Sequence, residues 1–333
     1  MSDKMTKDES KPSRIPSSAD FAQVGRGVLM GGADIIPGVS GGTVALILGI
    51  YERLVSAISH LDPTFLSFVA QRKIKDAAAH IDLRFLIPLG CGILVGVVAL
   101  GSVMHTLLED YRQFTMAAFF GMIGASCYLV AKLVNHWRMV EYALLLGGAI
   151  FAYWLVSQPA FSNPPDALWY VFVCGAIAIC AMILPGISGS FILLILGKYH
   201  EITGIIKEVI KLKISVASLM LVATFASGCL IGLISFSKIL KWLLSKHAAK
   251  TMAVLCGFML GSLKKIWPFQ IDTTPEVEEF KHKKFELLSL NEISYDTSFV
   301  ITIVIVIIAA AAVLLLDRFG KPMEEIPLED VSA

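Results

Sequence analysis

The sequence predicts an all-α polytopic membrane protein made of two inverted repeats, each with a broken or re-entrant helix followed by three transmembrane helices. Two observations carry this prediction. Of the 333 residues, 56% are hydrophobic and only 17% are charged, whereas soluble domains carry about 25% charged residues. In addition, a segment built around Pro-Gly-x-Ser-Gly occurs twice in the chain. A chain of this composition is solvated mostly by lipid, which excludes a soluble enzyme.

Two apolar regions, 21–59 and 167–206, are interrupted near the middle by Pro-Gly, so we expect a broken or re-entrant helix in each. With an offset of 148 residues, segment 33–51 aligns with 181–199, and 11 of the 19 pairs are identical. Downstream the offset becomes 136, where Thr-Met-Ala at 115–117 faces Thr-Met-Ala at 251–253. The chain is therefore predicted to be a duplication.

Uncharged apolar runs predict the ordinary transmembrane helices. About 20 apolar residues cross the hydrocarbon core, and runs of that order stand at 85–108, 113–131, 142–165, 214–237 and 297–316. A shorter run covers 247–263, and flanking lysine stems can complete it by reaching the interface. We expect six ordinary crossings.

These elements predict one integrated membrane domain. Its parts are a polar tail (1–20), a first repeat (21–160), a second repeat (167–316) with a polar loop (268–296), and a C-terminal tail (317–333). Residues 53–84 carry five Lys or Arg and 158–166 carry none, which predicts a cytoplasmic N-terminus and inverted repeats. Re-entry by the second element would place Lys198 outside, against this bias, so full crossing by one or both broken elements stays open.

The two breaks predict a binding site, because backbone that leaves a helix at membrane depth must be buried in protein or line a wet cavity. We expect unpaired N–H groups of Gly41, Gly42 and Thr43 to face an anion at the start of a half-helix, and phosphate fits such converging donors. The candidate substrate-binding residues are Pro37, Gly38, Ser40, Gly41, Gly42, Thr43, Pro185, Gly186, Ser188, Gly189 and Ser190, with Arg26 and Arg53 supplying positive charge.

Three carboxylates are candidates for coupling transport to protons. Asp34 lies one turn before the first break among apolar neighbours, with Arg26 or Arg53 as its expected partner. A structural ion pair is the alternative for this residue. Glu52 and Glu201 are the other two candidates for proton exchange. They belong to the triplets Tyr51-Glu52-Arg53 and Tyr199-His200-Glu201, which end the repeated segments and are candidate interfacial anchors.

Other chemistries lack their sequence signals. The seven histidines include no pair at i, i+4 spacing and the six cysteines form no Cys-x-x-Cys, so we expect neither a metal nor another cofactor. A net charge of +1 without a basic face argues against nucleic acid as a partner. The sequence 38–42 fits Gly-x-Ser-x-Gly, but a nucleophile elbow needs a preceding strand, so we expect no enzyme.

The string GGADIIPGVSGGT at 31–43, with its echo LPGISGS at 184–190, closely resembles the bacterial polyprenyl-phosphate transporter family. The resemblance implies a multi-pass protein of the bacterial cytoplasmic (inner) membrane. It implies that the protein flips undecaprenyl phosphate from the outer to the inner leaflet, which recycles the carrier lipid of cell-wall synthesis, without covalent chemistry. The expected partners are this polyprenyl phosphate lipid and membrane lipids.

Two other functions stay open, an ion-coupled transporter or channel for a small soluble anion and an integral membrane lipid phosphatase. A lipid carrier needs a lateral portal, whereas a soluble-anion carrier needs closed walls. Gly92-x-x-x-Gly96 permits close helix contacts, either within the protein or in a homodimer.

Overall fold

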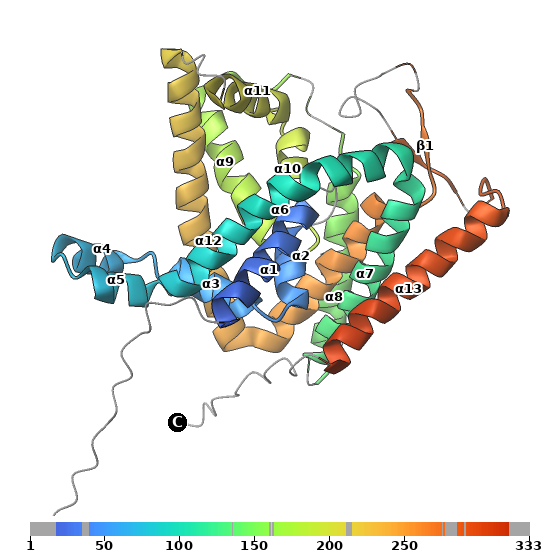
Figure 1. Ribbon diagram of the computed structural model, residues 1–333, viewed down its shortest axis with the longest axis horizontal. Coiled ribbons are helices and arrows are strands. Elements are labelled where there is room, and N and C mark those ends of the chain that lie inside the picture. The colour runs from blue at the N-terminus through green and yellow to red at the C-terminus, as the bar shows by residue number, and fades with distance from the viewer. Residues whose placement is uncertain are drawn as a thin grey trace, which may run out of the picture.

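The computed structural model describes residues 18–34, 40–134, 136–159, 161, 163–210, 215–274, 276, 285–289 and 291–319. Figure 1 shows their arrangement as a bundle of helices with one small hairpin. The elements are α1 (Ser18–Asp34), α2 (Gly41–Ile47), α3 (Tyr51–Ser59), α4 (Pro63–Ala70), α5 (Ile74–His80), α6 (Leu83–Asp110), α7 (Arg112–Lys132), α8 (Met139–Val156), α9 (Leu168–Ile183), α10 (Gly189–Ile195), α11 (Tyr199–Ile210), α12 (Val216–Ser262), the 3-10 turn η1 (Leu263–Ile266), β1 (Gln270–Asp272), β2 (Phe285–Leu287) and α13 (Thr297–Phe319).

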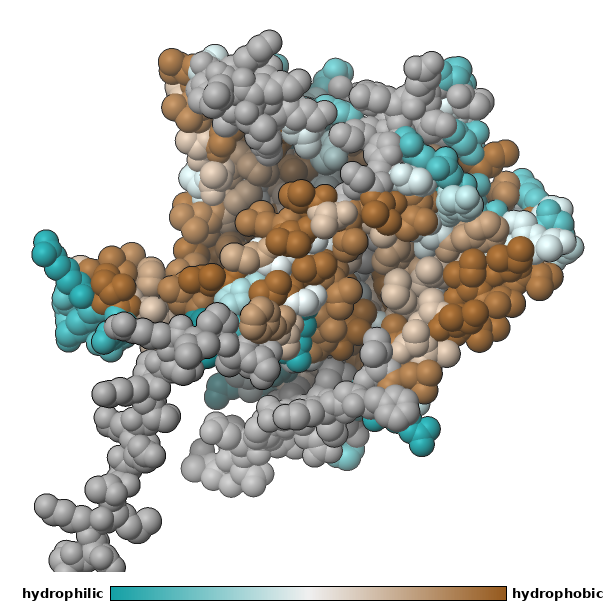
Figure 2. All heavy atoms as spheres, viewed as in Figure 1, coloured by the Kyte–Doolittle hydropathy of each residue, from teal (hydrophilic) through white to brown (hydrophobic). Residues whose placement is uncertain are grey.

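The expectation of an all-α polytopic membrane protein is confirmed at the level of its helices. In the described part of the chain, five segments are long and apolar enough to cross a bilayer, or six if α2 and α3, bent by 120°, form one span. The five are Leu83–Leu100, Arg112–Lys132, Met139–Val156, Val216–Ile266 and Thr297–Leu315. Large apolar side chains on α6 and α13 are exposed, and Figure 2 shows them as brown surface that suits a lipid surrounding.

Two predictions of transmembrane helices are wrong in detail, and two polar stretches contain secondary structure of their own. Helix α8 ends at Val156, not at 165, because the prolines from Pro159 onward cannot continue a helix. The segments 214–237 and 247–263 belong to one long helix, α12, in which only His247 leaves helical backbone angles. The polar stretch 60–84 contains the short helices α4 and α5, and 268–296 contains the antiparallel hairpin β1–β2.

Equivalent halves of the chain show matching backbone features. Tyr111 separates α6 from α7 with φ −129° and ψ 34°, and His247, 136 residues later, bends α12 with φ −139° and ψ 44°. Each broken region also turns after its seven-residue middle helix, since Gly49 and Gly197, 148 residues apart, both have positive φ after α2 and α10. Each Pro-Gly-x-Ser-Gly region therefore contains three helices, α1–α3 and α9–α11, where the sequence predicted two half-helices.

Glycines bring the long helices into backbone contact. A Cβ on Gly92 of α6 would lie 2.2 Å from the Val24 carbonyl oxygen of α1, and one on Gly96 would lie 2.3 Å from that of Val28. Helix α13 approaches α7 in the same way, with Gly121 against Val306, and Figure 1 shows the two helices side by side. The Gly92-x-x-x-Gly96 motif is used within the protein, so it gives no support to a homodimer.

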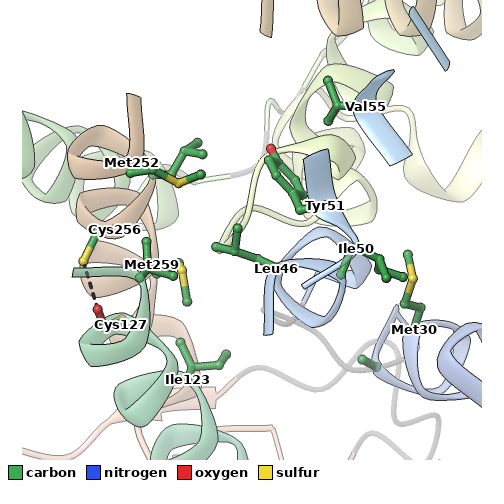
Figure 3. Close-up of a cluster of buried hydrophobic side chains, with 14 of the residues drawn as sticks. Met30, Leu46, Ile50, Tyr51, Val55, Ile123, Cys127, Met252, Cys256 and Met259 are labelled. Carbon is green, nitrogen blue, oxygen red and sulfur yellow. Dashed lines mark hydrogen bonds between the residues drawn. The ribbon is translucent and has the colours of Figure 1, made fainter. Parts of the chain in front are cut away.

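The core lies between the first broken region and the helices that follow each break. Figure 3 shows Leu46 and Tyr51 of α2 and α3 facing Met252 and Met259 of α12, with Ile123 of α7 beside them. Tyr51 is only 2% exposed, so the residue that the sequence presented as a possible interfacial anchor is a core residue. The start of α3 is thereby fixed against the rest of the bundle.

We expect Gly92→Ala to destabilise the protein, because its methyl group cannot fit against the α1 backbone and overpacking costs about 1–3 kcal/mol. Gly90→Ala in the same helix is the matched control, since nothing lies within 4 Å of its Cβ position and alanine favours the helix. Thermal unfolding in detergent would measure both. Equal melting temperatures for the two variants would contradict the close contact of α1 and α6.

Candidate binding site at the paired breaks

The two Pro-Gly-x-Ser-Gly elements meet in the structure although 148 residues separate them. Ser40 Oγ, at the N-cap of α2, donates to the carbonyl oxygens of Met182 and Leu184 at 3.1 and 3.4 Å. The hydroxyl of Tyr51 donates to the carbonyl oxygen of Ile183 at 3.1 Å. The last carbonyls of a helix lack partners within that helix, so side chains of the first element complete the end of α9.

A second contact runs in the opposite direction. The N–H of Gly186 donates to Thr43 Oγ1 at 2.8 Å, and both groups are buried. Gly186 has φ +85°, and a Cβ there would lie 2.8 Å from the backbone of Met259 and 2.9 Å from Ser262 Oγ. Glycine is therefore required at this turn by backbone angle and by space. Pro37 and Gly38, the matching residues of the first turn, lie outside the described residues.

The expectation of unpaired N–H groups at the start of α2 is wrong. Gly41 N–H donates to Asp34 Oδ1 at 2.6 Å, Gly42 N–H donates to Ser40 Oγ at 3.1 Å, and Thr43 N–H donates to the Ser40 carbonyl oxygen at 2.9 Å. The physical reason is that the protein supplies its own carboxylate where the sequence suggested an external anion. The Asp34 side chain thus connects the end of α1 to the start of α2.

The start of α10 is organised differently. Ser188 is its N-cap residue but its side chain makes no cap hydrogen bond, and Ser188 Oγ lies instead 2.8 Å from Ser190 Oγ. Ser188 is buried and Ser190 is exposed. Among the described residues, the N–H groups of Gly189 and Ser190 have no acceptor. Of the two breaks, the second therefore offers donors to a ligand.

The two arginines proposed as cations do not reach the breaks by any contact in the described part of the chain. Arg53 donates to Asp82 at 2.7 Å and stacks over the Phe85 ring, on the outer side of α3. Arg26 donates to Gln23, and it precedes Asp34 by eight residues of helix, about 12 Å along the axis. No ion pair joins Asp34 to either arginine among the described residues.

The carboxylates Glu52 and Glu201 occupy unlike surroundings. Glu52 lines a cavity of about 490 Å³ between α3, α5 and the start of α6, with Arg53, Ser56, Ala57, His60, Ala79, His80 and Asp82. Glu201 accepts from Lys198 at 2.6 Å, and Lys198, only 1% exposed, also donates to Asp166. This contact gives Glu201 a structural role at the α10–α11 turn.

His60 lies at the end of the cavity that faces α12. Lys241 donates to His60 Nε2 at 2.8 Å. Partial burial, then the positive charge of Lys241, lowers the pKa of His60. An ammonium group has donors and no acceptor, so His60 Nε2 is the acceptor in this contact. No cluster of three or more His, Cys, Asp or Glu that could hold a metal occurs in the residues that the structure describes.

Sequence reasoning missed a cation beside the second break. Lys265 of η1 places Nζ 4.4 Å from the ring centroid of Phe191, in the first turn of α10. It lies outside the repeated motif, and the pair Lys264–Lys265 at the end of an apolar run is typical of an interfacial anchor. The one sequence signal is the interruption of the duplication, since Leu129 occupies the matching position of the first repeat.

We expect Thr43→Val to lower the melting temperature, because it leaves the buried Gly186 N–H without an acceptor at a cost of about 1–3 kcal/mol. Thr43→Ser keeps the hydroxyl oxygen and is the control, expected to remain closer to the wild type. Thermal unfolding in detergent would compare the three proteins. A valine variant as stable as the wild type would contradict the importance of this contact between the breaks.

Comparison with known proteins assigns the chain to a family. The family model described as undecaprenyl phosphate translocase-like (VCA0040-like) matches residues 30–284, which include both breaks and most of the membrane helices. No solved structure matches the chain.

Two curated relatives carry the name polyprenyl-phosphate transporter. The protein from Vibrio cholerae is 39% identical over 245 residues, covering 74% of this chain and 77% of the relative. The protein from Staphylococcus aureus is 32% identical over 254 residues, covering 73% of this chain and 84% of the relative. These names indicate a transporter and not an enzyme. The chain therefore belongs to the undecaprenyl phosphate translocase-like family of membrane transporters.

Proposed function

We propose that the protein carries a polyprenyl phosphate from the outer to the inner leaflet of the bacterial cytoplasmic membrane, with the phosphate head passing the paired breaks. The observation that carries the proposal is the contact between the two Pro-Gly-x-Ser-Gly elements inside a bundle of apolar helices. Paired helix breaks at membrane depth are typical of the substrate site of a transporter. The names of the two relatives supply the substrate class.

The chemistry of the second break favours a phosphate head. Ser188, Ser190 and the N–H groups at the start of α10 are small donors close together. Ser190 is exposed, so a head group can approach it, while exposed apolar side chains on the long helices suit an isoprenoid tail that stays in lipid. In this proposal the candidate residues of the first break hold the second break in position, and those of the second break bind the phosphate head.

Alternating access follows from the duplication in this proposal. The matching bends at Tyr111 and His247, and the matching turns at Gly49 and Gly197, support two repeats of one plan. Inverted repeats with re-entrant elements would expose one central site to each leaflet in turn. The repeats would then rock about the contacts that join Thr43 to Gly186 and Ser40 to α9.

Coupling to protons is assigned to Asp34 in the same proposal. Its carboxylate accepts from Gly41 at the start of α2, so protonation would weaken a contact that holds the first break. Glu52 lines the cavity beside α3 and is the second candidate for proton exchange. A movement of α2 against α1 would link proton uptake to reorientation of the head-group site.

We expect proteoliposomes containing the protein to translocate a polyprenyl phosphate between leaflets faster than empty liposomes. Ser190→Ala removes one hydroxyl donor and is expected to slow this transfer about 3- to 10-fold, the cost of one net hydrogen bond. Neutral polyprenol, which lacks the phosphate, is the substrate control. Uptake of inorganic phosphate into the liposomes and release of inorganic phosphate from the lipid are measured in the same experiment. Uptake of inorganic phosphate without lipid transfer would favour a soluble-anion carrier, and release from the lipid would favour a phosphatase.

Neutralising Asp34 tests the coupling. Asp34→Asn keeps an oxygen that can accept from Gly41, so we expect the fold to persist while lipid transfer no longer responds to an imposed proton gradient. Transfer rates with and without the gradient would be compared in the same liposomes, with thermal unfolding as the folding control. If lipid transfer by this variant still responded fully to the proton gradient, the assignment of coupling to Asp34 would be contradicted.

A further inference from the structure

Lys265 is held against the second break by its neighbours along the chain. Its side chain lies over Phe191, the residue that follows Ser190 in the first turn of α10. Three residues before it, Ser262 lies next to Gly186, since a Cβ on that glycine would be 2.9 Å from Ser262 Oγ. The end of α12 and η1 therefore lie against the turn that carries Ser188 and Ser190.

A second cation, Arg112, stands beside Lys265. Arg112 Nη2 and Nε donate to Gln270 Oε1 at 2.9 and 3.3 Å, while Gln270 Nε2 donates to the backbone carbonyl of Lys265 at 3.3 Å. One glutamine side chain thus connects the two residues, and the Phe285 ring lies 3.5 Å from the Arg112 guanidinium. The loop around β1 and β2 holds both cations in place.

The positive charge of Lys265 is not balanced by an ion pair in the described part of the chain. The positive charge of Arg112 acts on Lys265, and both side chains are half-buried, where like charges repel more strongly than in water. Asp272 supplies a carboxylate near Arg112. Among the described residues no carboxylate forms an ion pair with Lys265. An added anion would relieve the repulsion.

The first half of the chain shows where an anion sits at such a break. There Asp34 accepts from Gly41 at the start of α2. The 148-residue offset pairs Gly41 with Gly189 and Asp34 with Met182, and the Met182 side chain lies 3.2 Å from the Cβ position of Gly189. The start of α10 thus lacks the built-in carboxylate, and it has Lys265 over its first turn, with Arg112 connected to Lys265 through Gln270.

We propose that Lys265 and Arg112, together with Ser188 and Ser190, form the binding site for a phosphate monoester head group at the second break. This inference rests on the proposed function and replaces Arg26 and Arg53 as the source of positive charge. Lysine acts as a point charge on phosphate oxygens and arginine donates from a planar fork, so the pair suits a dianionic monoester. Free inorganic phosphate shares this chemistry.

The test is binding of a short-chain polyprenyl phosphate to the full chain in detergent, with inorganic phosphate and neutral polyprenol as separate probes. We expect Lys265→Gln to weaken binding of the lipid phosphate about 10- to 100-fold, as loss of a charged hydrogen bond does. Lys265→Arg keeps the charge and is expected to retain most of the affinity. Lys264→Gln is the matched control, because Lys264 Nζ donates to Ser157 Oγ and lies over the Tyr153 ring of α8, not over α10.

Phe191→Leu separates a binding role of Lys265 from a structural one. If the lysine served only to stack on the ring, removing the ring would lower affinity and melting temperature as much as Lys265→Gln does. The inference predicts instead that the leucine variant binds the lipid within a few-fold of the wild type. Equal losses in the two variants would overturn it, as would wild-type affinity in Lys265→Gln.

The probes also separate this inference from the proposed function. Wild-type protein that binds inorganic phosphate but no lipid phosphate, with a loss in Lys265→Gln, would keep the anion site and overturn the lipid substrate. Lipid phosphate binding that is insensitive to Lys265 and Arg112 would keep the substrate and overturn the site. Binding of neither anion by the wild type would overturn both.

Discussion

Backbone that leaves a helix inside a bilayer has to find its hydrogen-bond partners within the protein, and this constraint determines how the two breaks are arranged. The carbonyl groups at the end of α9 accept from Ser40 and Tyr51, and the N–H of Gly186 finds Thr43. Each break therefore depends on the other half of the chain. The position of α10, and with it the serine hydroxyls, follows from this mutual dependence.

In this account the two breaks have different roles, because different charged groups lie beside them. The start of α2 has its own anion, Asp34, which accepts from the N–H of Gly41. The start of α10 has Met182 in that place and Lys265 over Phe191, and Gln270 connects Lys265 to Arg112. In the proposed function, the first copy of the motif is held by contacts within the protein, and the altered second copy supplies the donors that meet the substrate.

Much of this arrangement could be predicted from the sequence. The repeated Pro-Gly-x-Ser-Gly identified both breaks, because the same proline and glycine pattern in corresponding halves of a membrane protein indicates paired broken helices. The contact of Thr43 with Gly186 could not be predicted in detail, since a repeat does not state which atoms of its copies meet. Lys265 was missed because tertiary packing, not sequence spacing, brings η1 to α10. The hydrogen bond from Gly41 to Asp34 was missed for the same reason, because its two partners are seven residues apart in the sequence.

The most direct measurement is an experimental structure of the protein in a lipid nanodisc with a bound polyprenyl phosphate. The account predicts the phosphorus atom at the start of α10, within contact distance of Ser190 and Lys265, with the isoprenoid tail leaving between apolar helices into lipid. A phosphate bound elsewhere, such as in the cavity beside Glu52 and His60 with the second break empty, would contradict the central claim.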